Sequence, residues 1–180
     1  AAHRAFIWNA RCTNELYAQI DQNKKDQKMI NHYLDLYNSN VLINDQHLAK
    51  LVIHNDGNDH NILVNPSGKI NGIIDFGDMA HTFLASELAV AITYLILEEA
   101  EPETKIKSVV QGFQSVYPLR DEEIESLIHL VCVRACFSVV TANYRKKLFP
   151  ENKYISVTEP YAWTFLKNFA DKELSNFKIY

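Results

Sequence analysis

Residues 52–64 read Val-Ile-His-Asn-Asp-Gly-Asn-Asp-His-Asn-Ile-Leu-Val, and residues 72–78 read Gly-Ile-Ile-Asp-Phe-Gly-Asp. The apolar triplets in and beside these stretches are rich in β-branched residues, which predicts short strands. Residues 65–68, Asn-Pro-Ser-Gly, have the composition of a tight turn, so two of the strands should form a hairpin. A buried sheet would then hold the polar residues at strand ends and in one loop.

The polar residues of this segment include two carboxylates and an amide at a defined spacing. Asp56 is a loop carboxylate suited to orient an attacking hydroxyl and to accept its proton. Asn61 and Asp75 offer a neutral and an anionic oxygen, a pair suited to Mg²⁺ that carries the phosphate oxygens of a nucleotide. A base, an amide and a metal-binding aspartate in this order match the catalytic loop and metal motif of kinases.

The segment from His54 to Asp78 resembles the aminoglycoside phosphotransferase and choline kinase-like superfamily, small-molecule kinases with a protein kinase-like fold. The run from Asp75 to Ala89 is most similar to the hydroxylysine kinase branch and to related domains fused to class III aminotransferases. The resemblance implies an α+β fold that is mostly α. It would be a protein kinase-like C-terminal lobe, with a helical bundle around a short central β-hairpin that carries the catalytic loop.

The same resemblance implies a phosphotransferase that uses Mg²⁺ with ATP or GTP. Its acceptor would be the hydroxyl of a small, amine-bearing metabolite that is hydroxylysine-, homoserine-, choline- or aminoglycoside-like. His54 would support the catalytic loop through hydrogen bonds, and Glu87 would anchor it at a position where relatives commonly carry Asp. His60 and Asp78 are candidates for substrate or phosphate contacts, although the ring of His60 could instead pack locally.

Two features separate this segment from protein kinases. Seven residues lie between Gly77 and Ala85, where protein kinases have a long activation segment. Asn55 stands where those kinases carry the Arg that reads activation-loop phosphate. The resemblance therefore predicts a small hydroxyl-bearing substrate and no activation by loop phosphorylation.

The sequence has no glycine before Gly57. A phosphate-binding glycine loop needs backbone amides that approach the ligand closely, and side chains obstruct that approach. In the resembled superfamily this loop belongs to a preceding N-terminal lobe. We therefore expect this chain to be the C-terminal lobe of a longer protein and to be nearly inactive alone. Its expected partner is the missing N-terminal lobe, and a fused aminotransferase domain is a second candidate partner. Exposed lobe-interface residues would favour self-association.

Apolar periodicity predicts a helical frame around this segment. The predicted helices cover residues 13–21, 23–38, 83–100, 102–117, 121–146 and 158–176. Glu87 lies in the apolar part of its helix, so we expect it to find partners among the backbone donors of the catalytic loop. A surface-facing Glu87 is the alternative. The inward stripe of the helix over 121–146 consists of Ile124, Leu127, Ile128, Val131 and Ala135.

The length and composition of the 180-residue chain fit one globular domain. Its expected parts are a helical lead-in (1–50), the catalytic loop and hairpin (51–80) and a helical subdomain (81–180). A net charge of -4 without a basic stripe argues against nucleic acid as a partner. We expect no membrane association, because the longest mainly apolar run, Leu88 to Leu97, is too short to span a bilayer and no signal peptide is visible.

The three cysteines do not have the spacing of a disulfide framework. Cys132 and Cys136 lie one helical turn apart in an apolar segment, so we expect buried free thiols there. Cys12 leaves the count odd. This pattern fits a reducing cytoplasm.

Two other functions stay open at this point. The first is a metal-dependent hydrolase with a zinc or two-metal site. Its candidate ligands are His54, Asp56, Asp59, His60 and Asp75. That reading leaves Asn61 and the Asp-Phe-Gly run unexplained. The second is a non-catalytic regulatory or assembly lobe, against which the presence of Asp56, Asn61 and Asp75 together argues.

Overall fold

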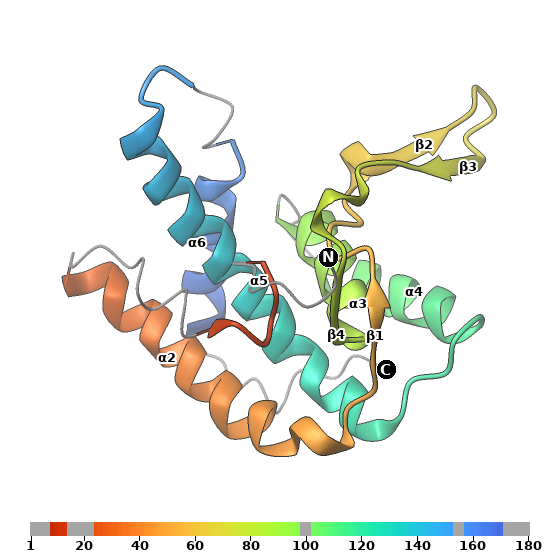
Figure 1. Ribbon diagram of the computed structural model, residues 1–180, viewed down its shortest axis with the longest axis horizontal. Coiled ribbons are helices and arrows are strands. Elements are labelled where there is room, and N and C mark those ends of the chain that lie inside the picture. Colours follow the sequence, from red (N-terminus) through yellow and green to blue (C-terminus); the bar gives the residue numbers. More distant parts are fainter. Residues whose placement is uncertain (1–7, 14–23, 98–101, 153–156, 171–180) are drawn as a thin grey trace.

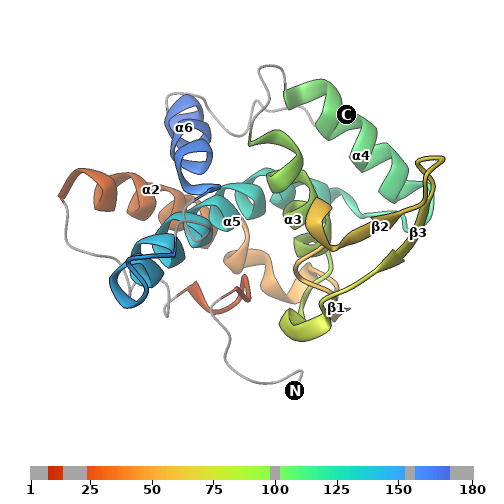
Figure 2. The same cartoon turned by 90° about the horizontal axis from the view of Figure 1, so that it is seen from above.

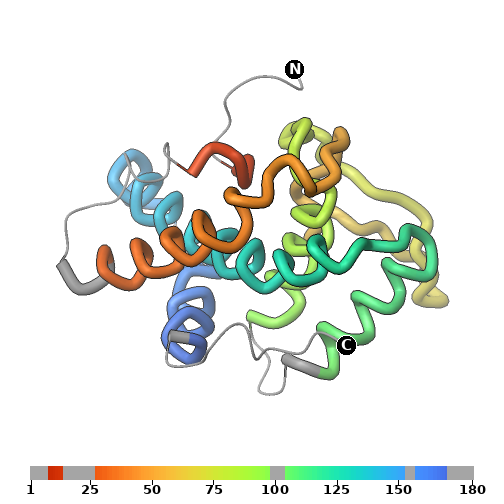
Figure 3. The backbone as a smooth tube through the Cα atoms, turned by 90° about the horizontal axis from the view of Figure 1, so that it is seen from below, coloured from red at the N-terminus to blue at the C-terminus, as the bar shows by residue number. Residues whose placement is uncertain are grey.

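A long helix, α5 (Asp121–Leu148), runs through the middle of the molecule, and the other helices pack around it (Figure 1). This computed structural model describes residues 8–13, 24–97, 102–152 and 157–170. Helices α2 (Lys24–Asn40), α3 (Ala85–Ile96) and α6 (Glu159–Ala170) each contact α5, and α4 (Pro102–Gln114) packs on α3. Figure 3 shows α2 and α5 side by side along much of the body.

Burial on α5 extends round the whole helix. From Glu123 to Ala142 every residue except Glu125 is buried, so the predicted inward stripe is confirmed as one part of a helix that is covered on several sides. By length and composition, α5 is long and apolar enough to span a bilayer. It is therefore longer than the Leu88–Leu97 run, which the sequence analysis took as the longest mainly apolar run when it argued against a membrane span. Its most apolar stretch is 94% buried inside the fold, which identifies it as a core helix.

Two small antiparallel sheets flank this helical body. Strand β1 (Lys50–Ile53) pairs with β4 (Ala80–Phe83), and β2 (Ile62–Val64) pairs with β3 (Ile70–Ile73). The register of the first pair places Lys50 opposite Phe83. The mostly helical α+β fold expected from the sequence is confirmed, with two sheets in place of one central hairpin.

Strand β4 corrects the predicted start of the apolar helix. Residues 80–83 pair with β1, so α3 begins at Ala85 and not at Phe83. Thr82 and Phe83 are both fully buried, and β-branched and aromatic residues favour a strand where a partner is available. The partner is thirty residues earlier in the chain, beyond the range that periodicity samples.

The β2–β3 hairpin is exposed, whereas the sequence predicted a buried sheet. Val64 and Ile70 face each other across the hairpin and are 59% and 65% exposed. Figures 1 and 2 show why, since the hairpin projects from the end of the molecule opposite to α2 and α6. Its β-branched residues therefore form an apolar surface and not part of the core.

The remaining helices follow the predicted ranges closely. Helix α2 buries Ile30, Tyr33, Leu34 and Tyr37, and the two tyrosine hydroxyls donate hydrogen bonds to the backbone carbonyls of Leu166 and Ala10 respectively. Burial raises the pKa of the Tyr37 hydroxyl well above its ordinary value. Of the helix predicted over 13–21, residues 14–21 lie outside the described part of the chain. Residues 171–176 of the last predicted helix also lie outside it.

The prediction of buried free thiols on α5 is confirmed. Cys132 and Cys136 are both buried and unpaired with another cysteine, and Cys12 is a free thiol of intermediate exposure. Burial raises the pKa of the Cys132 thiol well above its ordinary value. These two thiols are therefore core residues and not nucleophiles.

Candidate active site

The carboxylate of Asp56 is held at both oxygens in the loop that follows β1. Its Oδ1 accepts a hydrogen bond from Arg134 Nη2 at 2.8 Å, and its Oδ2 accepts one from Asn61 Nδ2 at 3.0 Å. The same Asn61 nitrogen donates to the Asp56 backbone carbonyl at 2.9 Å. The Asp56 side chain remains 19% exposed, so an incoming hydroxyl can reach this oriented carboxylate.

Asn61 and Asp75 are brought together by the start of the hairpin. Asn61 ends the 3₁₀ turn η2 (Asp59–Asn61), and its backbone carbonyl accepts a hydrogen bond from Ile74 N at 3.0 Å. Asp75 follows directly, is exposed, and has a left-handed backbone with φ of 63°. Because Nδ2 of Asn61 is committed to Asp56, its Oδ1 is the oxygen left to bind a cation. The amide oxygen and the Asp75 carboxylate are the hard donors that Mg²⁺ prefers.

The ring of His54 contacts both the loop at Asp56 and the chain after β3 at Ile74. Its Nδ1 accepts a hydrogen bond from Asp56 N at 3.3 Å, and its Nε2 lies 2.9 Å from the Ile74 carbonyl. The tautomer that fits both contacts carries its proton on Nε2, which then donates to the Ile74 carbonyl. The Phe76 ring packs edge-on at 5.0 Å. Both ring nitrogens of His54 are therefore engaged by backbone groups, a geometry that suits a residue that supports the loop.

Glu87, in the first turn of α3, contacts the catalytic loop directly. Its Oε2 accepts a hydrogen bond from the backbone N–H of Asn55 at 2.9 Å. Asn55 is buried, has a left-handed φ of 64°, and donates from its side chain to the carbonyls of Trp8 and Asp78. A Cβ on Gly57 would lie 2.9 Å from Glu87 Oε1, so glycine is the residue that lets this carboxylate approach the loop.

Arg134 is the residue of the site that the sequence analysis missed. It lies on α5, 78 residues after Asp56, and is 4% exposed. Its guanidinium carbon lies 4.5 Å from the Trp8 ring centre and 5.6 Å from the Tyr94 ring centre. The available signal was its position three residues after Val131 and seven after Leu127, in phase with the inward stripe.

The two other candidate contact residues lie at the edges of the site. His60 is exposed in η2, where its backbone N–H donates to Asn58 Oδ1 at 3.0 Å. Asp78 ends the 3₁₀ turn η3 (Phe76–Asp78), and its backbone carbonyl accepts from Asn55 Nδ2 at 3.2 Å. These contacts place both residues beside the loop without giving either one a part in holding Asp56.

The hydrolase alternative is not favoured by this geometry. No group of three or more His, Cys, Asp or Glu side chains suited to a metal ion occurs within the described ranges, which include all five candidate ligands. The ring nitrogens of His54 already bond the backbone. A zinc site built on these residues would require breaking the contacts that hold the loop.

The profile of the phosphotransferase enzyme family (APH) matches residues 2–122, about two thirds of the chain. The chain belongs to this phosphotransferase family. It is 38% identical to a hydroxylysine kinase from Xenopus laevis, 34% to one from Bos taurus and 32% to one from Mus musculus. Each match covers 92% of this chain and 47 to 48% of the relative, so the chain spans about half the length of these curated relatives. The family expected from the catalytic loop is thereby confirmed.

Proposed function

We propose that this chain is the catalytic-loop half of a small-molecule kinase. The complete protein would transfer the γ-phosphoryl group of ATP or GTP to the hydroxyl of a small metabolite. Hydroxylysine is the first candidate acceptor, because the relatives named above carry that word in their names. The observation that carries the proposal is the Asp56 carboxylate, oriented by Asn61 and Arg134 and still accessible beside Asp75.

In this mechanism each residue has one task. Asp56 accepts a hydrogen bond from the acceptor hydroxyl and aims its oxygen at the γ-phosphorus. As the new O–P bond forms and the bond from the γ-phosphorus to the departing nucleoside diphosphate breaks, Asp56 takes up the hydroxyl proton. Asn61 Oδ1 and the Asp75 carboxylate would hold Mg²⁺, which supplies positive charge against the phosphate oxygens when bound. His54 and Glu87 keep the loop in place through the backbone bonds described above.

The nucleotide cleft needs a second wall, which we assign to the half of the relatives' length that this chain does not match. The exposed apolar residues beside Asp75 support this arrangement, since Phe76 is 54% and Ile74 44% exposed. An apolar surface next to a metal-binding carboxylate suits contact with a nucleotide base or with another lobe. The free thiols fit a reducing compartment such as the cytoplasm.

The test is ATP-dependent phosphorylation by the full-length protein, assayed against hydroxylysine, homoserine, choline and an aminoglycoside. Replacement of the base, Asp56→Asn, should lower kcat by about 10²- to 10⁴-fold, the usual contribution of a general base. Asp35→Asn, an exposed aspartate on α2, is the matched control and should leave kcat unchanged. Wild-type turnover in the Asp56→Asn protein would contradict the proposal.

A further inference from the structure

The guanidinium of Arg134, which orients the proposed base, is held by few hydrogen bonds of its own. Its Nη2 donates to Asp56 Oδ1 at 2.8 Å and lies 3.4 Å from the Tyr94 hydroxyl. Its Nε and Nη1 are buried, and neither finds an acceptor among the residues that the structure describes. Hydrogen bonds through one nitrogen do not fix the plane of a guanidinium, so this arrangement needs a further contact to hold it.

The indole of Trp8 supplies such a contact. The guanidinium carbon of Arg134 lies 4.5 Å from the centre of the Trp8 ring, closer than the 5.6 Å to the Tyr94 ring. Tryptophan gives the strongest cation–π attraction of the aromatic side chains, and its face does not compete for the N–H group that bonds Asp56. The Phe137 ring, one turn after Arg134 on α5, lies 6.4 Å from the indole between ring centres, which limits the movement of the indole itself.

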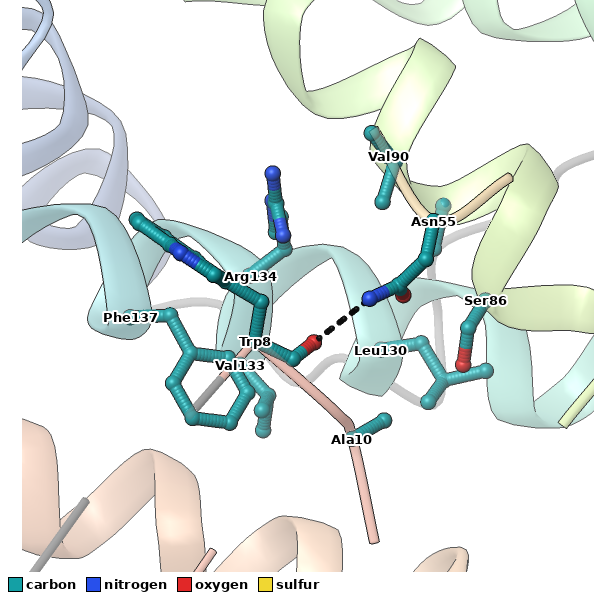
Figure 4. Close-up of a pocket in the computed structure, with 10 residues that line it drawn as sticks. Trp8, Ala10, Asn55, Ser86, Val90, Leu130, Val133, Arg134 and Phe137 are labelled. Carbon is teal, nitrogen blue, oxygen red and sulfur yellow. Dashed lines mark hydrogen bonds between the residues drawn. The ribbon is translucent and has the colours of Figure 1, made fainter. Parts of the chain in front are cut away.

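The backbone of Trp8 contacts the catalytic loop as well (Figure 4). Its carbonyl accepts a hydrogen bond from Asn55 Nδ2 at 3.3 Å, which Figure 4 draws as a dashed line. Asn55 directly precedes Asp56, is buried and has a left-handed φ of 64°. Trp8 therefore contacts the neighbour of the base with its backbone, and the arginine that holds the base with its side chain.

We infer that Trp8 is a positioning residue for Asp56, because its indole fixes the Arg134 guanidinium that holds the carboxylate. The inference rests on the proposed kinase function, in which the direction of this carboxylate decides how well the acceptor hydroxyl is aligned. Loss of the indole should leave the acceptor bound but less well aligned. The effect should therefore appear in kcat and not in KM.

The experiment uses the full-length protein, ATP, and whichever of the four acceptors named above the wild type phosphorylates best. Trp8→Leu keeps apolar bulk and loses the ring face, so kcat should fall by about 3- to 30-fold, with each KM changed by less than about twofold. Trp8→Phe keeps a smaller ring with a weaker attraction and should lower kcat less, by about two- to fivefold. The control is Trp163→Leu, because Trp163 is a half-buried tryptophan of α6 that also faces a cation, Lys167 Nζ at 6.0 Å from its ring centre. Its kcat should equal that of the wild type.

A double-mutant cycle separates positioning through Arg134 from a general structural role. Arg134→Gln removes the donor to Asp56 and should lower kcat by about 10- to 100-fold. In that background Trp8→Leu should lower kcat further by less than about twofold, because no guanidinium is left to hold. A tryptophan that only stabilised the fold would have the same effect in both backgrounds.

Several results would overturn the inference while the kinase proposal survives. They are a wild-type kcat in Trp8→Leu, an effect of Trp8→Leu on KM alone, an equal fall in kcat in Trp163→Leu, and an equal fall in the wild-type and Arg134→Gln backgrounds. If Trp8→Leu does not fold, Trp8→Phe takes its place in the cycle and is judged by the same results. A wild-type protein that phosphorylates none of the four alcohols would remove the proposed function, and this inference with it.

Discussion

The two sides of the catalytic loop are built differently. On the side that faces the helices, Asn55 and Arg134 are buried. Glu87 of α3 and Arg134 of α5 form hydrogen bonds with the loop. On the hairpin side, Asp75 is exposed and the paired strands beyond Asn61 project into solvent. The helical side is thus fixed by core packing, whereas the hairpin side presents functional groups on a surface that the described body does not cover. Substitutions on the two sides should therefore affect different measurements.

The largest effect is expected on the hairpin side, and on activity alone. Asn61 and Asp75 are the pair of residues proposed to bind Mg²⁺, and Asp75→Asn removes the anionic oxygen of that pair. The kcat/KM of the full-length protein should therefore fall at least about 100-fold. Asparagine tolerates the left-handed backbone and can still accept from Gly77 N, so the melting temperature should change by less than about 2 °C.

Asp59→Asn is the control for this prediction. Asp59 is also an exposed carboxylate near the site, in the η2 turn that ends at Asn61, and it would matter only if the site were a hydrolase metal centre. The kinase activity of Asp59→Asn should be unchanged. A large loss in both variants, or a strongly destabilised Asp75→Asn protein, would remove the distinction between the two sides.

On the helical side, the expected effect is on stability. Gly57→Ala places a Cβ 2.9 Å from Glu87 Oε1, and that carboxylate is held by the Asn55 N–H. The free energy of unfolding should fall by about 1–3 kcal/mol, as for other overpacked sites. In a Glu87→Asp background the carboxylate is one methylene shorter, so the same alanine should cost less. Urea unfolding of the wild type, Gly57→Ala, Glu87→Asp and the double variant measures the coupling free energy between the two sites. If the two changes in unfolding free energy are strictly additive, the close approach of Gly57 and Glu87 does not constrain the loop.

These features differ in how well the sequence predicted them. Asp56, Asn61 and Asp75 lie within twenty residues and have local motif context, so their types and spacing were enough to propose that they form one site. Arg134 required knowledge of which helix face meets a loop 78 residues away, although its phase on α5 was visible. Strand β4 required knowledge of its distant partner β1.

The exposure of the hairpin could not be predicted from its composition. β-branched residues at Val64 and Ile70 indicate a strand, but they do not show whether another element covers it. The packing of the described helices leaves this surface open. Local patterns therefore predicted the candidate site residues and most of the elements, whereas long-range packing decided which of them are buried.

A smaller, pH-dependent effect is expected where α5 holds the first sheet. The Glu123 carboxylate accepts hydrogen bonds from the backbone N–H groups of Ala49, just before β1, and of Arg120. Burial alone would raise the pKa of Glu123, but these bonds and the Arg120 guanidinium outweigh it and hold the pKa below its ordinary value. The stabilisation is therefore present above the unfolded-state pKa and is lost as the pH falls through the lower folded-state value.

Glu123→Gln should remove this contribution. Its unfolding free energy should be lower than that of the wild type by about 1 kcal/mol at pH 7, and the gap should close as the pH falls below about 4. Glu122→Gln, an exposed neighbour on the same turn, should show no such pH-dependent gap. A gap that is constant from pH 7 to pH 3 would show that the carboxylate acts through packing and not through its charge.

The smallest effect on stability should come from the hairpin itself. Val64 and Ile70 are opposite each other on exposed strands, so replacing both with threonine keeps β-branching and removes apolar surface without opening the core. The unfolding free energy should change by less than about 0.5 kcal/mol. Self-association of the 180-residue chain, measured by sedimentation over a range of concentrations, should weaken, because an apolar edge favours contact between copies. A strong loss of stability would mean that the hairpin belongs to the core, and the contrast between the two sides of the loop would no longer hold.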